Sequence, residues 1–152
     1  MPNWCSVTVD IYCNDKTNAA ILRRKLLSQK KKADKKGIGM FIGSDRYLFS
    51  PDIGIFGESV VFISGEVKWG FCDDEVFAFI KHLKALIDFS VMTISYEEPG
   101  FLLYGEYIYK NGELFNRYVP PDKFPEYEDE SYFEQLENLM ETCSRKVYLG
   151  AI

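Results

Sequence analysis

The chain has 152 residues, 47% hydrophobic and 27% charged, which is typical of one soluble globular domain with a real core. No apolar stretch reaches the roughly 18–20 residues needed to span a bilayer, so we expect no membrane partner. The formal net charge is −5 but is unevenly spread. Residues 1–50 carry 10 basic and 4 acidic side chains, whereas residues 51–152 carry 8 and 19.

A strand and a basic helix are the first predicted elements. Residues 4–13 alternate apolar and polar side chains, with Cys5 and Cys13 on one face. These two cysteines lie about 26 Å apart along such a strand, beyond disulfide reach. The four cysteines also lack metal-ligand spacing, so we expect free thiols, no metal, no cofactor and a cytoplasmic protein. Asp15 predicts the start of a helix that runs from about residue 17 into the thirties, and Gly37 its end.

A strand–helix–strand unit occupies residues 60–97. Alternation over residues 60–69 predicts a strand, helical spacing over 73–87 predicts a helix, and residues 89–97 are extended again. The carboxylates of residues 73–75 favour a helix N-terminus. The second strand of the sheet is assigned to residues 40–42 or 47–49, and residues 51–57 are interpreted as a loop.

The C-terminal third predicts a hairpin and a helix. Aromatic strands over 101–110 and 113–119 flank Asn111-Gly112, the strongest short hairpin signal. An acidic stretch over 122–130 precedes a helix that begins near Ser131. The order βαββαβ therefore predicts an α+β, ferredoxin-like sandwich with an added C-terminal β-hairpin and helix. We expect a single domain over 1–152, with its core at about 3–119 and the acidic loop and last helix at 120–152.

Three short motifs resemble those of a known family. They are the opening residues Met1-Pro2-Asn3-Trp4-Cys5, the pair Lys68-Trp69 before the second helix, and Tyr96-Glu97-Glu98-Pro99-Gly100 before an aromatic strand. In this order they resemble the Api92/YubB group of ferredoxin-like proteins, over roughly residues 1–112. The chain departs from that group at Ser6 and at Gly70-Phe71-Cys72. The resemblance implies a small plasmid, phage or mobile-element protein, and it implies no particular activity.

The interleaved tyrosines and acids of the C-terminal third favour a protein-binding surface. Such a surface suits a non-enzymatic accessory protein with an unidentified protein partner, and its spaced acids can also imitate a nucleic-acid backbone. The residues assigned to this surface are Tyr107, Tyr109, Glu126, Tyr127, Glu128, Asp129, Glu130 and Tyr132. An ordinary hairpin with an acidic loop is the competing interpretation.

Two other sites stay open at this point. The basic helix could contact nucleic-acid phosphates through Arg23, Arg24, Lys30, Lys31 and Lys32, or it could be a solvated face. Because the rest of the chain is acidic, nucleic acid is the alternative hypothesis. Asn3, Trp4, Trp69 and Glu97 could line a pocket, or the tryptophans could close one end of the core. A small enzyme is the third hypothesis, with no catalytic residue assigned and the oligomeric state open.

Overall fold

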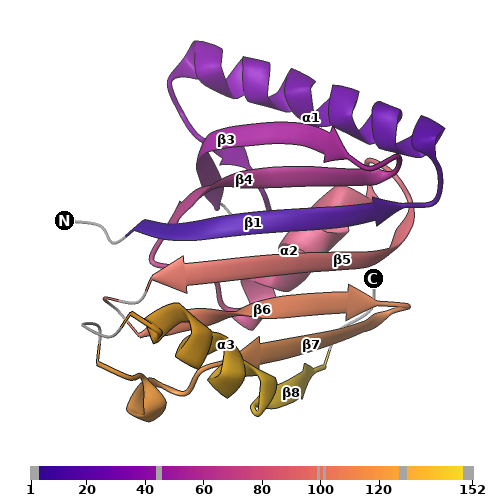
Figure 1. The fold of residues 1–152 in the computed structure, drawn as a ribbon. Helices are drawn as coiled ribbons and strands as arrows, with labels where there is room; N and C mark the ends of the chain where they lie inside the picture. Colours follow the sequence, from indigo (N-terminus) through magenta and orange to yellow (C-terminus); the bar gives the residue numbers. More distant parts are fainter. Residues whose placement is uncertain (1–3, 44–45, 99, 101, 127–129, 149–152) are drawn as a thin grey trace.

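The computed structural model describes residues 4–43, 46–98, 100, 102–126 and 130–148. Within these ranges the chain forms one eight-stranded antiparallel sheet, in the order β2-β3-β4-β1-β5-β6-β7-β8, and three α-helices (Figure 1). The class is therefore mixed α+β, as the sequence predicts. The elements are β1 (Trp4–Cys13), α1 (Lys16–Lys36), β2 (Met40–Phe41), β3 (Tyr47–Phe56), β4 (Val60–Lys68), α2 (Asp73–Lys84), β5 (Phe89–Glu98), β6 (Leu103–Lys110), β7 (Glu113–Tyr118), the short 3₁₀-helix η2 (Pro121–Lys123), α3 (Tyr132–Glu141) and β8 (Ser144–Val147).

One face of the sheet carries the main core. Val9 of β1 lies opposite Ile63 of β4 and Ile94 of β5, and all three are fully buried. Leu22 and Leu26 of α1 pack into the same cluster as Phe79 and Leu83 of α2. Both helices therefore cover the same face of β1, as the patterns predict. The side chains of β1 that alternate with the buried ones, such as Ser6 and Thr8, point to the other face of the sheet and are exposed.

The helix boundaries follow from local chemistry. Asp15 accepts a hydrogen bond from the backbone N–H of Asn18 at 2.7 Å and caps α1. Gly37 ends α1 in the left-handed conformation, with φ 67°, where its missing Cβ removes the steric penalty. At α2, Glu75 accepts from the backbone N–H of Cys72 at 3.0 Å. Carboxylates 73–75 therefore begin this helix as expected.

The sheet is larger than the sequence predicts, and the predicted loop at residues 51–57 is wrong. Both candidate segments for the second strand form strands, because β2 and β3 pair through Met40 with Leu48 and Phe41 with Tyr47. β3 then continues through Pro51 to Phe56. The pairing of β3 with β4 shifts register between Phe49 and Asp52, close to the edge of the sheet. Pro51 lies within this irregular stretch, where its lack of a backbone N–H removes no regular hydrogen bond between the strands.

The C-terminal third extends the same sheet rather than standing apart from it. Asn111 (φ 51°) and Gly112 (φ 84°) form the predicted hairpin turn between β6 and β7. β8, which the sequence does not reveal, pairs with β7 along Leu114 to Arg117. α3 lies in front of the sheet and α2 behind it in Figure 1. A small second cluster, in which Leu136 and Met140 pack near Val119, holds α3 in place.

No helix in the described ranges is long and apolar enough to cross a membrane.

Candidate functional site

The strands added at β6, β7 and β8 form a pocket beside the beginning of α2, which we call the tyrosine pocket. It has a volume of about 620 Å³. On its sheet wall, Tyr96 of β5, Gly105 of β6 and Tyr118 of β7 stand in one cross-strand row. A Cβ at Gly105 would meet the Tyr96 hydroxyl at 2.6 Å, so glycine at this position leaves the room that the phenol occupies. The missing side chain at Gly105 therefore lets the Tyr96 ring take its place in the lining of the pocket.

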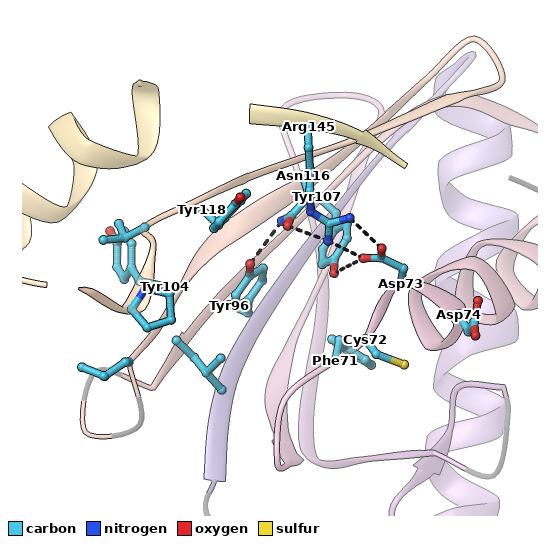
Figure 2. Close-up of a pocket in the computed structure, with 14 residues that line it drawn as sticks. Phe71, Cys72, Asp73, Asp74, Tyr96, Tyr104, Tyr107, Asn116, Tyr118 and Arg145 are labelled. Carbon is cyan, nitrogen blue, oxygen red and sulfur yellow. Dashed lines mark hydrogen bonds and ion pairs between the residues drawn. The ribbon is translucent and has the colours of Figure 1, made fainter. Parts of the chain in front are cut away.

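A polar network organises the wall of the tyrosine pocket (Figure 2). Arg145 of β8 donates two hydrogen bonds of 2.7 Å to the carboxylate of Asp73 at the beginning of α2. The hydroxyl of Tyr107 donates to the same carboxylate at 2.8 Å. Arg145 also donates to the amide oxygen of Asn116 at 3.1 Å, and the Asn116 amide nitrogen donates to the Tyr96 hydroxyl at 3.1 Å. The network thus ties α2 to four strands of the sheet, β5, β6, β7 and β8.

The network fixes the ionisation of its members. The hydrogen bonds from Arg145 hold the pKa of Asp73 below its ordinary value, and those same bonds raise the pKa of Arg145. Burial, followed by the bond to Asp73, raises the pKa of Tyr107. At the rim, burial raises the pKa of the exposed Cys72 thiol. At neutral pH the pocket therefore holds a paired carboxylate, a guanidinium, neutral phenols and a neutral thiol, an arrangement suited to binding.

Two further hollows lie on the other face of the sheet, beside α3. The first, about 460 Å³ in volume, lies over Ser6, Thr8 and Ser95, and its acids are Glu97, Glu106, Glu137 and Glu141. Arg117 lies in the same hollow and pairs with Glu106 at 2.7 Å. The second, about 630 Å³, is lined by Glu97, Glu98, Leu102 and Phe133 among others. Both therefore meet at Glu97, and all three hollows surround the connection between β5 and β6.

Exposed apolar side chains gather at the same end of the sheet. Nine large hydrophobic side chains of the described residues are exposed. Six of them belong to the end where β1 and β6 begin and β4 and β5 finish, and we call this region the end surface (Figure 1). Its apolar members are Trp4, Ile38, Phe41, Trp69, Leu102 and Phe133. Exposed apolar side chains gathered at one end of a sheet make that end a candidate interaction site.

Backbone strain at the end surface presents two of these side chains. Trp69, whose exposed fraction is 61%, has φ 68°, and Leu102 has φ 57°. Bulky residues rarely adopt this left-handed region, at a cost of about 1–3 kcal/mol. Arg46 holds the turn at Trp69, since it donates at 2.6 Å to the carbonyl of Lys68 and also to the carbonyl of Gly70. An ion pair with Glu75 at 3.0 Å fixes Arg46 in turn.

The structure corrects part of the predicted protein-binding surface. Tyr107, Tyr109 and Tyr132 are only 3%, 4% and 5% exposed, so none of them is presented to a partner. The reason is strand alternation: Tyr107 and Tyr109 point to the face that α2 covers, and Tyr109 packs on Phe89. Tyr132 packs with Leu136 in the cluster under α3. The prediction of these three tyrosines as surface anchors is therefore wrong.

Two of the acids assigned to that surface lie within the described residues. Glu126 and Glu130 are exposed, as expected for the acidic stretch. Tyr127, Glu128 and Asp129 lie outside the described residues, so their assignment stays a prediction.

The structure also bears on the suggested pocket at Asn3, Trp4, Trp69 and Glu97. Trp4 and Trp69 do not close the core, because both are exposed. Trp4 instead packs edge-on against Phe49 at 5.2 Å, with the Lys68 ammonium above both rings. Glu97, opposite Ser6, shares the face of Trp4 and lines both hollows beside α3. Asn3 lies outside the described residues.

The basic helix presents its charge to solvent. α1 carries nine basic side chains and one acidic side chain. Arg23, Arg24, Lys31 and Lys32 are exposed, and Lys30 is half-buried. None of these five forms an ion pair within the described part of the chain. The charge of this helix is therefore free to meet a partner.

Sequence reasoning missed the residues that organise the tyrosine pocket. In the sequence, Asp73 indicates only the beginning of a helix. Its partner Arg145 lies 72 residues further along the chain, in a strand that the sequence does not predict. The one available signal is Asn116, a polar residue at an inward position of a predicted strand, which proves to be 3% exposed. Across the described residues, no group of His, Cys, Asp and Glu side chains is placed to hold a metal ion.

No protein-family model, curated protein or solved structure matches this chain.

Proposed function

We propose that this chain is a non-enzymatic protein-binding module whose working surface is the end surface. One observation carries the proposal: six of the nine exposed large hydrophobic side chains belong to one end of the sheet. Two of them, Trp69 and Leu102, have a backbone in the strained left-handed region. Strain of this kind is typically found at functional sites. Tryptophan is also one of the residues enriched among interface anchors.

The chemistry around the end surface supports binding of a partner with both charged and apolar groups. Glu97 and Glu98 lie beside Leu102 and Phe133 in one hollow. Apolar anchors within a polar rim are the usual anatomy of a protein interface. The acids of this proposed surface, Glu97 and Glu98, differ from those that the sequence assigns to the acidic stretch at 122–130.

Removing the two strained anchors tests the proposal. The double substitution Trp69→Asn and Leu102→Asn deletes both apolar side chains, and asparagine tolerates the left-handed backbone better than most residues. The immobilised chain is incubated with an extract of its natural host, and the retained proteins are identified by mass spectrometry. We expect partners of the unaltered chain to be lost from this variant, while its thermal unfolding changes little.

A matched control lies at the opposite end of the sheet. Tyr12 and Phe56 are also exposed, at the far ends of β1 and β3. The substitutions Tyr12→Thr and Phe56→Thr remove a similar apolar area and should leave the retained proteins unchanged. Equal retention by both variants would mean that the end surface is not the working surface.

Nucleic-acid binding through α1 is the second candidate, favoured by nine basic side chains against one acid on a single helix. The open face of the sheet speaks against base stacking there, since Asp10, Glu66, Glu97 and Glu106 share that face. Contact would therefore be confined to phosphates, which confers affinity without sequence preference.

We expect only weak nucleic-acid binding at physiological salt, because residues 51–152 carry 19 acids. Any binding at low salt should fall steeply as salt rises, and Lys30→Gln, Lys31→Gln and Lys32→Gln together should weaken it equally for all sequences. The control changes Lys81, Lys110 and Lys123 to Gln, which removes as much charge from other exposed positions. Fluorescence anisotropy with labelled DNA and RNA duplexes measures both. Tight binding at physiological salt that only the α1 variant abolishes would reverse the ranking.

The fold and the sequence motifs support a proposal about origin. We propose that strands β3-β4-β1-β5, with α1 and α2 on one face, are a ferredoxin-like core to which strands are added at both edges of the sheet. Together with the opening motif and Lys68-Trp69, this order supports membership of the Api92/YubB-like group and a mobile-element context. The cysteines of the described chain are free thiols, which fits a reducing cytoplasm.

A further inference from the structure

The last two turns of α1 form one wall of a small hollow at the end surface, which we call the lysine hollow. It has a volume of about 270 Å³. Side chains three and four residues apart share one face of a helix, and the face that lines this hollow carries Gln29, Lys32, Ala33 and Lys36. The segments after α1 and one residue of α2 complete the lining, with Ile38, Gly39, Phe41, Tyr47 and His82.

The inside of the lysine hollow is apolar, and its rings are held by their neighbours. Phe41 packs edge-on against Tyr47 at 5.9 Å and against His82 at 5.5 Å. His82 donates through Nε2 to the side-chain oxygen of Gln29 at 3.3 Å. Burial lowers the pKa of His82, so its ring is neutral at pH 7. Phe41 nevertheless keeps 44% of its surface exposed, and a partner could bury that part of the ring.

Only positive charge borders the lysine hollow. Lys32 and Lys36 are exposed, and neither forms an ion pair within the part of the chain that the structure describes. No acidic side chain is among the described residues that line the hollow. The acids of the end surface, Glu97 and Glu98, line a different hollow beside α3, on the other face of the sheet. The two lysines are therefore available to an acidic partner.

We infer that the lysine hollow binds an acidic peptide segment of the partner protein; this inference rests on the proposed function. One large apolar side chain of that segment enters the hollow against Phe41. Carboxylates on either side of it pair with Lys32 and Lys36.

Shape and charge together favour this occupant. The volume of the hollow falls below the roughly 300–1,000 Å³ typical of small-molecule sites, so one large side chain suits it better than a whole cofactor. A nucleic-acid duplex could contact the two lysines, but its phosphates would leave Phe41 exposed. A membrane requires apolar side chains that project outward, whereas these line a recess. An acidic segment with an apolar anchor matches both the lysines and the rings.

Selection from a library of random peptides tests the inference first. The immobilised full chain is exposed to random dodecapeptides displayed on phage, and a labelled peptide with the recovered consensus is then titrated by fluorescence anisotropy. We expect a consensus that places one aromatic or large aliphatic residue among aspartates and glutamates. A consensus without acids, or the recovery of no consensus, would overturn the inference.

Two charge variants of α1 decide whether the lysine hollow is the site. Lys32→Gln with Lys36→Gln should weaken binding of the consensus peptide by about 5- to 10-fold, as the loss of two exposed ion pairs does. The matched control, Lys31→Gln with Lys35→Gln, removes the same charge from exposed positions of the same turns that do not line the hollow. It should weaken binding by less than about 2-fold. Equal losses for the two pairs would contradict a site at the hollow.

An apolar variant provides the second arm. Phe41→Ser should weaken peptide binding by about 10-fold or more, because it removes the ring that the anchor contacts. Phe56→Ser, which removes an exposed ring at the opposite end of the sheet, should leave binding unchanged. Thermal unfolding checks that each variant is folded, and Ile38→Ser takes the place of Phe41→Ser if the latter is not. Peptide binding that withstands the loss of either apolar side chain would overturn the inference.

Two other probes cover the competing occupants. A labelled DNA duplex that binds at physiological salt, and whose binding is lost with Lys32 and Lys36 but not with Phe41, would identify a phosphate-binding surface and overturn the inference. Vesicles of phosphatidylserine and phosphatidylcholine that sediment the chain, unless Phe41 is replaced, would identify a membrane site and overturn it too.

This inference and the proposed function fail differently. If the Trp69 and Leu102 variant loses host proteins that the Lys32 and Lys36 variant retains, the end surface binds its partner outside the lysine hollow and only the inference is wrong. If the consensus peptide binds at the hollow while the Trp69 and Leu102 variant retains every host protein, the proposed role of the whole end surface is wrong.

Discussion

Replacing Phe79 by alanine should lower the free energy of unfolding by about 3–5 kcal/mol. Phe79 is 1% exposed and belongs to the cluster in which both helices meet the sheet. Its ring stacks against Phe71 at 6.3 Å, so truncation removes that contact as well as the buried area. Val76, Ile80 and Leu83 surround the site from the same helix and leave little freedom to close the cavity. Chemical denaturation measures the change.

The same substitution two positions earlier provides the control. Phe77 lies on the partly exposed side of α2, where its ring contacts the Lys81 ammonium at 5.3 Å. Phe77→Ala has the same effect on helix propensity but removes much less buried surface, so it should cost about 1 kcal/mol. Similar losses for the two variants would contradict the assignment of the core face of α2.

Replacing Asn116 by alanine should have the second largest effect, a loss of about 1–3 kcal/mol. Asn116 is the one polar side chain among the buried residues of the described chain. Its amide donates to the Tyr96 hydroxyl and to the carbonyl of Glu106 at 3.2 Å, and its oxygen accepts from Arg145. Alanine leaves these partners without their hydrogen bonds in a region that excludes most water.

A double-mutant cycle separates the network from simple truncation. Tyr96→Phe removes one partner of Asn116 and little else. Because the two groups share a hydrogen bond, the double variant should lose less stability than the two single variants together. The exposed Asn138→Ala in α3 is the control, and it should change stability by less than about 0.5 kcal/mol. Strict additivity of the first pair would mean that the 3.1 Å contact contributes nothing.

Neighbouring residues were enough to predict much of the fold. The cap at Asp15, the left-handed Gly37 and the turn at Asn111-Gly112 each depend on groups within about four residues, so their patterns are visible in the sequence. The alternation in β1 and the helical spacing in α2 likewise predicted which side is buried. Pro51 indicates a loop when the sequence is considered alone, but β3 accommodates it because this strand lies near the edge of the sheet.

The candidate site was less visible because distant segments build it. The direction of Tyr107 depends on which face α2 covers, and the partner of Asp73 is Arg145, on a strand that exists only because β7 offers an edge. A tyrosine-rich segment therefore predicted an exposed surface where the fold forms a pocket.

The class of fold, the positions of the three helices and the separation of basic and acidic residues along the chain can all be predicted from the sequence. That Trp4, Phe41, Trp69, Leu102 and Phe133 share one end of the sheet becomes visible only in the folded chain. Helix caps and hydrophobic periods are local, whereas strand order is set by contacts between residues far apart in the chain. A surface assembled from strand ends exists only once that order is fixed.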